Sequence, residues 1–183
     1  MKVIKIIAII SLILTTATWA SDFHAKQPLF ITAAGQSQDV TMVKILAQKA
    51  GLKFSFDKLA KVDKLKDHAT LVLVTGGSTK GLGAANIDKD QELARVNSLI
   101  KGAREMKMKI ITMHVGGPSR RGKLSDEFNK MTAQIADCLI IVKTGDEDQL
   151  FSKIAEEKKM PIYLIEKIIE AGDVMKEIFA EKK

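Results

Sequence analysis

The chain has 183 residues, with 29 basic and 22 acidic side chains and a formal net charge of +7 at pH 7. This length suits one domain with its own hydrophobic core. The positive excess is mild and most lysines are interleaved with acids. One Trp, one Tyr and seven Phe are too few for the basic, aromatic-rich stripe typical of nucleic-acid binding. We therefore expect no nucleic acid among the partners of this protein.

The first twenty residues have the layout of a secretory signal peptide. Lys2 and Lys5 form a basic start, "IIAIISLIL" is a short apolar run, and small residues lead to Ala20. The run is short for a membrane span, which takes about 20 apolar residues. We expect cleavage after Ala20, a periplasmic or secreted mature chain, and no stable membrane span after cleavage. A retained membrane anchor is the alternative.

After the predicted signal peptide (residues 1–20), we expect a short tail at residues 21–28 and a single α/β domain at residues 29–183. Six apolar runs of strand length recur, at residues 29–34, 52–56, 71–75, 109–115, 138–142 and 161–165. The run at 52–56 is the weakest. Continuous apolar runs are typical of strands that helices cover on both faces.

Helical periodicity separates these runs. Helices are expected from Asp39 to Gly51, from Asp88 to Lys107, after Ser125, after Asp146 with Gln149 as a capping-box-like partner, and near Asp173. The alternation predicts a three-layer αβα sandwich with a mainly parallel sheet of five or six strands. The simplest topology is flavodoxin-like or Rossmann-like, with strand order 2-1-3-4-5 and one added edge strand.

The single cysteine, Cys138, excludes an internal disulfide, so the core alone must stabilise an exported chain of this size. It lies in the apolar run "DCLIIV", which indicates a small buried side chain and not a reactive thiol.

In sheets of this kind, ligands bind beyond the carboxyl ends of the strands. Glycines there let backbone N–H groups approach an anion. Three loops at that edge place hydroxyls and amides beside cations, and we expect them to bind a small anionic ligand. The candidate residues are Gly35, Gln36, Ser37, Gly76, Gly77, Ser78, Thr79, Lys80, His114, Arg120 and Arg121. The alternative is that these glycines only turn the chain from strand to helix.

No cofactor is predicted, and no metal site. His24 and His68 have no ligand-like spacing to Cys, Asp or another His. His114, at the end of the fourth strand, is the best-placed titratable group, although a lone histidine is more often structural than catalytic.

The stretch "LVLVTGGSTKGLGAAN" imitates nucleotide-binding motifs without matching them. A P-loop needs lysine directly after its second glycine, whereas Lys80 precedes Gly81. A serine nucleophile elbow needs glycine where Lys80 stands. The turn and the pair Tyr163 and Lys167 resemble short-chain dehydrogenases. The glycine spacing differs, however, and "PIYLI" is a predicted strand, on which that pair would be about 13 Å apart. We reject a dehydrogenase.

Three segments together resemble a family of exported, periplasmic bacterial proteins with a domain of unknown function. They are "PLFITAAGQSQDVTMVKILAQKAGL", "LVLVTGGSTKGLGAANIDKDQELARV" and "HVGGPSRRGKLSDEF". The resemblance covers essentially the whole mature chain. It implies a three-layer αβα domain outside the cytoplasm and no activity.

The sequence thus favours a binding protein over an enzyme, with catalytic residues unknown. One alternative is a hydrolase or transferase that uses Ser78 or His114. Another is a protein-interaction module of the cell envelope, which an exposed apolar patch away from the loops would favour.

Overall fold

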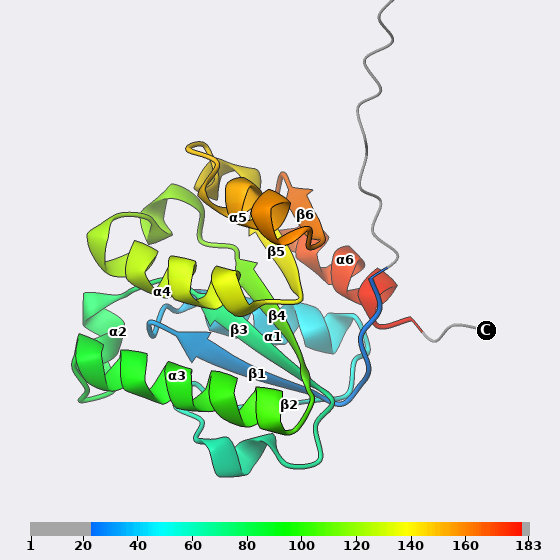
Figure 1. Ribbon diagram of the computed structural model, residues 1–183, viewed down its shortest axis with the longest axis horizontal. Coiled ribbons are helices and arrows are strands. Elements are labelled where there is room, and N and C mark those ends of the chain that lie inside the picture. The colour runs from blue at the N-terminus through cyan, green and yellow to red at the C-terminus, as the bar shows by residue number, and fades with distance from the viewer. Residues whose placement is uncertain (1–22, 181–183) are drawn as a thin grey trace, which may run out of the picture.

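The computed structural model describes residues 23–180, which fold around one six-stranded sheet. The strands are β1 (Leu29–Ala34), β2 (Phe54–Phe56), β3 (Thr70–Thr75), β4 (Lys109–His114), β5 (Cys138–Val142) and β6 (Ile162–Ile165). All pairings are parallel, in the order β2-β1-β3-β4-β5-β6. The predicted flavodoxin-like order with an added edge strand is confirmed (Figure 1).

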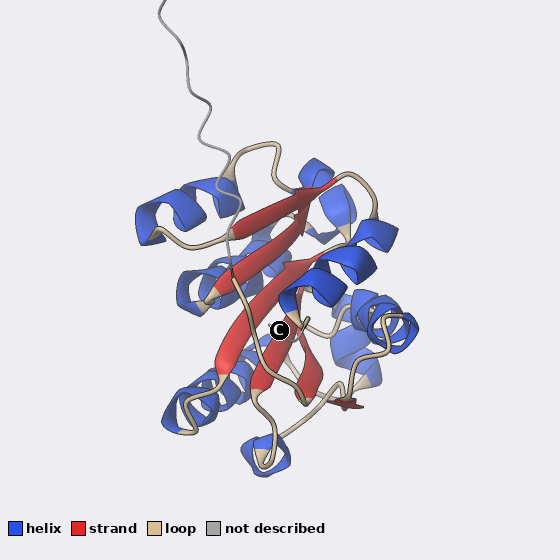
Figure 2. Ribbon diagram, turned by 90° about the vertical axis from the view of Figure 1, so that its right-hand side faces the viewer, coloured by secondary structure: helices blue, strands red, loops and turns tan. Residues whose placement is uncertain are grey.

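Helices cover both faces of the sheet, as Figure 2 shows with the strands lying between two helical layers. They are α1 (Asp39–Lys49), α2 (Thr79–Ala84), α3 (Lys89–Glu105), α4 (Lys123–Ile135), α5 (Leu150–Lys158) and α6 (Ala171–Ile178). Helices α1 and α6 share a core with one face of the sheet, whereas α3, α4 and α5 pack on the other. The three-layer αβα class is therefore confirmed.

The central strands form because their apolar runs are buried on both faces: β1, β3 and β5 are buried at every position, whereas the edge strands β2 and β6 are only partly buried. Cys138 is fully buried at the start of β5, and burial raises the pKa of its thiol. It is the small core side chain that the sequence predicts. Tyr163 lies on strand β6, so it and Lys167 do not share a helix.

Three local predictions are wrong. Residues 79–84, expected as a loop, form the short helix α2, because the Ser78 hydroxyl caps it by accepting from the Gly81 N–H at 3.0 Å. Helix α4 begins at Lys123, so Ser125 lies inside it. Gln149 makes no capping bond. Asp146 instead accepts N–H bonds from residues 151 and 152 at the start of α5.

Among residues 23–180, no helix combines the length and the apolar composition that crossing a membrane takes. The predicted signal peptide and its cleavage position after Ala20 lie outside the described residues.

Candidate functional site

The strand order reverses at β1 and β3, and their carboxyl ends carry the loops that the sequence singles out. An open sheet has its crevice at such a point. Here the two loops touch: Gln36 and Gly77 form an antiparallel bridge, and the Ser78 N–H donates to the Gly35 carbonyl at 2.9 Å. The switch point is therefore closed by backbone contacts.

Glycine is required where these loops meet. A Cβ on Gly35 would lie 2.6 Å from the carbonyl oxygen of Gly76, and one on Gly81 would lie 2.0 Å from that of Gln36. Gly116, after β4, is covered by the side chains of Arg120 and Asp39. These glycines allow one segment to pack on another, so the glycine-rich composition by itself does not indicate a phosphate site.

A buried carboxylate holds the first loop in place. Glu92, on α3, is fully buried and accepts bonds from the Gly35 N–H and the Gln36 side-chain amide, both at 3.0 Å. Arg95 neutralises it, with its Nε 2.7 Å from Glu92 Oε2. Gln36 has a positive φ of 60°, a backbone conformation that residues other than glycine rarely adopt. The hydrogen bonds to Glu92 stabilise it. In the sequence, Glu92 is only one of several acidic residues in the first turn of a predicted helix. No local pattern indicates that it is buried or that it binds the first loop.

Arg120 and Arg121, which follow β4, differ in how many hydrogen bonds their guanidinium groups form. Arg121 pairs with Asp126 and Asp148 and also donates to the Gly145 carbonyl. Hydrogen bonding from Arg121 lowers the pKa of Asp148 to about 2. Burial alone would raise the pKa of Asp126, but hydrogen bonds from Arg121 and Asn129 lower it. Arg121 thus joins the loop after β4 to helix α4 and to the loop after β5, and it has a structural role.

Arg120 is less fully bonded. Its Nε donates to Asp39 Oδ2 at 3.0 Å, and its stem lies against Gly76 and Gly116. Asp39 also accepts a hydrogen bond from the Ser37 hydroxyl, which is 1% exposed. Within residues 23–180, neither Nη1 nor Nη2 of Arg120 forms a hydrogen bond. The guanidinium is therefore oriented by Asp39 while its outer edge is unused.

The remaining candidates belong to the loop after β3 and to helix α2. Gly77 donates to the hydroxyl of Ser125 at 3.0 Å. Thr79 and Lys80 are exposed on α2, and within residues 23–180 Lys80 makes no ion pair. Ser78 accepts a bond at its hydroxyl and donates that proton to no described residue.

His114 is fully buried beneath the loops, with its ring 4.9 Å from that of Phe151. Its Nε2 lies 3.2 Å from the Gly117 carbonyl, so Nε2 carries the proton of the neutral ring. Within the described part of the chain, Nδ1 has no hydrogen-bond partner. Burial lowers the pKa of His114, and the charge of Arg121 adds to that effect.

This lowered pKa predicts acid sensitivity. Below the ordinary histidine value of about 6.5, the unfolded chain takes up a proton that folded His114 resists, so stability falls as the pH falls through this range. In His114→Gln, the loss of unfolding free energy between about pH 7 and pH 5 should be smaller than in the wild type. Urea denaturation across this range measures it, and equal pH dependence in the two proteins would contradict the assignment.

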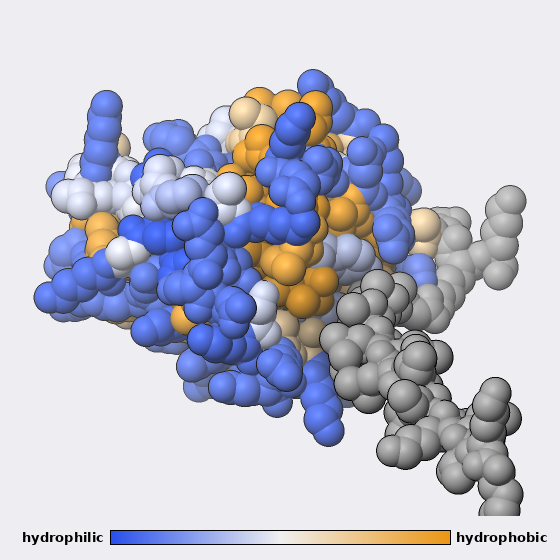
Figure 3. Space-filling model, turned by 90° about the horizontal axis from the view of Figure 1, so that it is seen from above, coloured by the Kyte–Doolittle hydropathy of each residue, from blue (hydrophilic) through white to orange (hydrophobic). Residues whose placement is uncertain are grey.

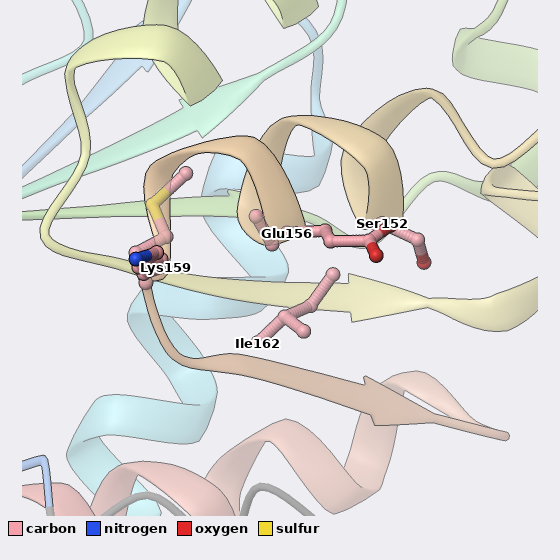
Figure 4. Close-up of a pocket in the computed structure, with 6 residues that line it drawn as sticks. Ser152, Glu156, Lys159 and Ile162 are labelled. Carbon is pink, nitrogen blue, oxygen red and sulfur yellow. The ribbon is translucent and has the colours of Figure 1, made fainter.

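Other hollows lie away from these loops. A shallow cavity of about 270 Å³ lies between α5 and the start of β6 (Figure 4), lined by Ser152, Ala155, Glu156, Lys159, Met160 and Ile162. Two larger cavities lie at the amino ends of the strands, and residues 24–26 line both of them. Within residues 23–180, no three His, Cys, Asp or Glu side chains are placed to hold a metal ion.

Comparison with solved structures gives distant likenesses. A GDSL-like lipase from Bacteroides thetaiotaomicron is 14% identical, with a TM-score of 0.35, over 73% of this chain and 65% of the lipase. The chain thus spans just under two thirds of that protein's length. A mutant of the esterase AlinE4 is 10% identical, with a TM-score of 0.31, over 89% of this chain and 86% of the esterase. At TM-scores this low, these likenesses say nothing about the activity of the chain.

Comparison with curated protein sequences finds no match. A family model does match, and it spans residues 26–179, from the segment before β1 to the end of α6. That range includes all three loops on which the sequence resemblance rests. The chain therefore belongs to the family DUF6305, a domain of unknown function, as its loops predict.

Proposed function

We propose that the carboxyl edge of the sheet binds a small anionic ligand, with the guanidinium of Arg120 as its main contact. The observation that carries this proposal is the state of Arg120, whose Nε is held by Asp39 while Nη1 and Nη2 form no hydrogen bond within residues 23–180. Its side chain is 24% exposed. An oriented guanidinium with two free nitrogens suits the two oxygens of a carboxylate or phosphate.

Neighbouring groups support the same ligand chemistry. The Ser78 hydroxyl has a proton available for a ligand oxygen, and exposed Lys80 follows it on α2. Arg121 is excluded as the contact because Asp126 and Asp148 already occupy it. The Arg120 stem itself covers Gly76 and Gly116, so the ligand would lie against the outer edge of the guanidinium.

Arg120→Met tests the proposal, because methionine keeps an apolar stem and removes the guanidinium. A charge-assisted hydrogen bond contributes about 1.5–3 kcal/mol, so we expect binding to weaken at least about tenfold. Acetate and inorganic phosphate serve as probes in titrations of isotope-labelled protein, read from the backbone amide signals of residues 76, 77 and 116. Lys123→Met, three residues away on an exposed position, removes the same charge and should bind like the wild type.

Failure of both probes to shift these signals in the wild-type protein would contradict the proposal. Equal weakening in Arg120→Met and Lys123→Met would reduce the effect to nonspecific charge. Native mass spectra of gently purified protein add an independent measurement, since a discrete mass lost on denaturation reports a bound natural ligand.

Two other functions make different predictions for the same spectra. A protein-interaction module is favoured by an apolar area on the side that carries α5 and β6 (Figure 3). Leu164, on β6, and Ile169, just after it, are 42% and 63% exposed. It predicts a co-purified protein or an oligomer. Hydrolysis by Ser78 or His114 would require Ser78 to leave its capping bond, or His114 to leave its buried position.

A further inference from the structure

The edge of the sheet opposite the candidate site carries a row of lysines, which we call the amino edge: Lys26, Lys53, Lys107 and Lys109. Lys53 precedes β2, Lys26 precedes β1, and the other two lie at the start of β4. The strand order places β2, β1, β3 and β4 side by side. Because neighbouring strands are about 4.8 Å apart, these lysines lie along one short stretch of surface.

The surface between these lysines is hollowed. One cavity of about 730 Å³ is bordered by Lys26 and Lys53, and a second of about 410 Å³ by Lys26, Lys107 and Lys109. Lys26 belongs to both, so the two hollows are adjacent. Met106, which lines the second, is 45% exposed and adds an apolar group beside the cations.

Most of this positive charge is not neutralised. Asp137 pairs with Arg104 and Lys109, and Glu105 faces Lys101 at 4.0 Å. Within residues 23–180, Lys26, Lys53 and Lys107 form no ion pair. Helix C-termini favour cations and account for the lysines that follow helices, but Lys26 precedes a strand. The amino edge therefore offers at least three free ammonium groups to an anionic partner.

The chain also leads to this edge from its apolar N-terminal run. Residues 23–28 run along the amino edge into β1, with the Thr70 hydroxyl donating to the Lys26 carbonyl at 2.7 Å. Upstream, residues 15–22 join this segment to the apolar run Ile6–Leu14. At full extension that connection reaches about 30 Å. During export, before the cleavage expected after Ala20, a membrane that holds the apolar run thus brings the amino edge near its surface.

We infer that the amino edge is a docking surface for an anionic phospholipid membrane. Headgroup phosphates meet Lys26, Lys53 and Lys107, and Met106 reaches the interfacial region between them. Each lysine near an anionic bilayer contributes the equivalent of about a fivefold change in affinity, and the attraction weakens as salt is raised. This surface is separate from the carboxyl edge and does not depend on a ligand there.

The test is co-sedimentation of residues 21–183, which contain every described helix and strand, with vesicles of equal parts phosphatidylcholine and phosphatidylglycerol. We expect salt-sensitive binding to these vesicles and none to phosphatidylcholine alone. The triple variant Lys26→Gln, Lys53→Gln, Lys107→Gln should bind roughly a hundredfold more weakly. The control triple Lys123→Gln, Lys130→Gln, Lys153→Gln removes the same charge from exposed positions elsewhere and should bind like the wild type.

Three results would overturn the inference: no binding of the wild type to anionic vesicles, equal binding to phosphatidylcholine alone, or equal loss in the two triple variants. Circular dichroism and urea denaturation of both triples establish that a loss of binding is not a loss of fold.

Discussion

Replacing Glu92 with alanine is expected to lower the free energy of unfolding by about 3–5 kcal/mol, the cost of removing one partner from a buried ion pair. Glu92 is fully buried, and the Arg95 side chain is only 12% exposed. The substitution leaves that guanidinium without its carboxylate and leaves the Gly35 N–H and the Gln36 amide without an acceptor. Urea denaturation measures the change.

Glu105→Ala is the matched control, because it removes a carboxylate from the same helix. Its side chain is 67% exposed and lies 4.0 Å from Lys101, so the expected change is within about 0.5 kcal/mol. A cost below about 1 kcal/mol for Glu92→Ala would show that the network does not support the first loop.

Gly81→Ala is expected to destabilise the protein by about 3 kcal/mol, at the upper end of what overpacking costs. A methyl group at this position would lie 2.0 Å from the carbonyl oxygen of Gln36, which is backbone and cannot rotate away. Relief requires the first loop or α2 to move, and either movement breaks the contact that closes the switch point.

Gly83→Ala, in the same helix α2, should have the opposite sign. Nothing lies within 4 Å of a Cβ placed there, and alanine is favoured over glycine in a helix by up to about 1 kcal/mol. Thermal denaturation of the two variants beside the wild type gives the comparison. Similar midpoints for both would mean that α2 does not pack on the first loop as described.

Both predictions concern contacts with Gln36, and together they bear on the candidate site. Glu92 accepts a hydrogen bond from the Gln36 side-chain amide, and Gly81 packs against the backbone carbonyl of Gln36. These contacts fill the crevice expected between the ends of β1 and β3. The surface left for a ligand is therefore the outer edge of the Arg120 guanidinium, whose stem covers Gly76 and Gly116.

The sequence alone determined the architecture. Continuous apolar runs such as those of β3 and β5 predict strands that helices cover on both faces. Helices of regular period between such runs leave few ways to arrange a parallel sheet. The burial of Cys138 followed from its neighbours for the same reason. Strand burial and helix period are determined by residues that are close together in the chain, so both can be predicted from the sequence alone.

Only the tertiary structure decided what the loops do. Arg120 and Arg121 are adjacent and chemically alike, yet Arg121 is used by Asp126 and Asp148 whereas Arg120 is held by Asp39 through one nitrogen. Glycines that looked like a phosphate loop are required by contacts between distant segments. Hydrogen bonds and close approaches of this kind join residues dozens of positions apart, and no local periodicity encodes which partner each will meet.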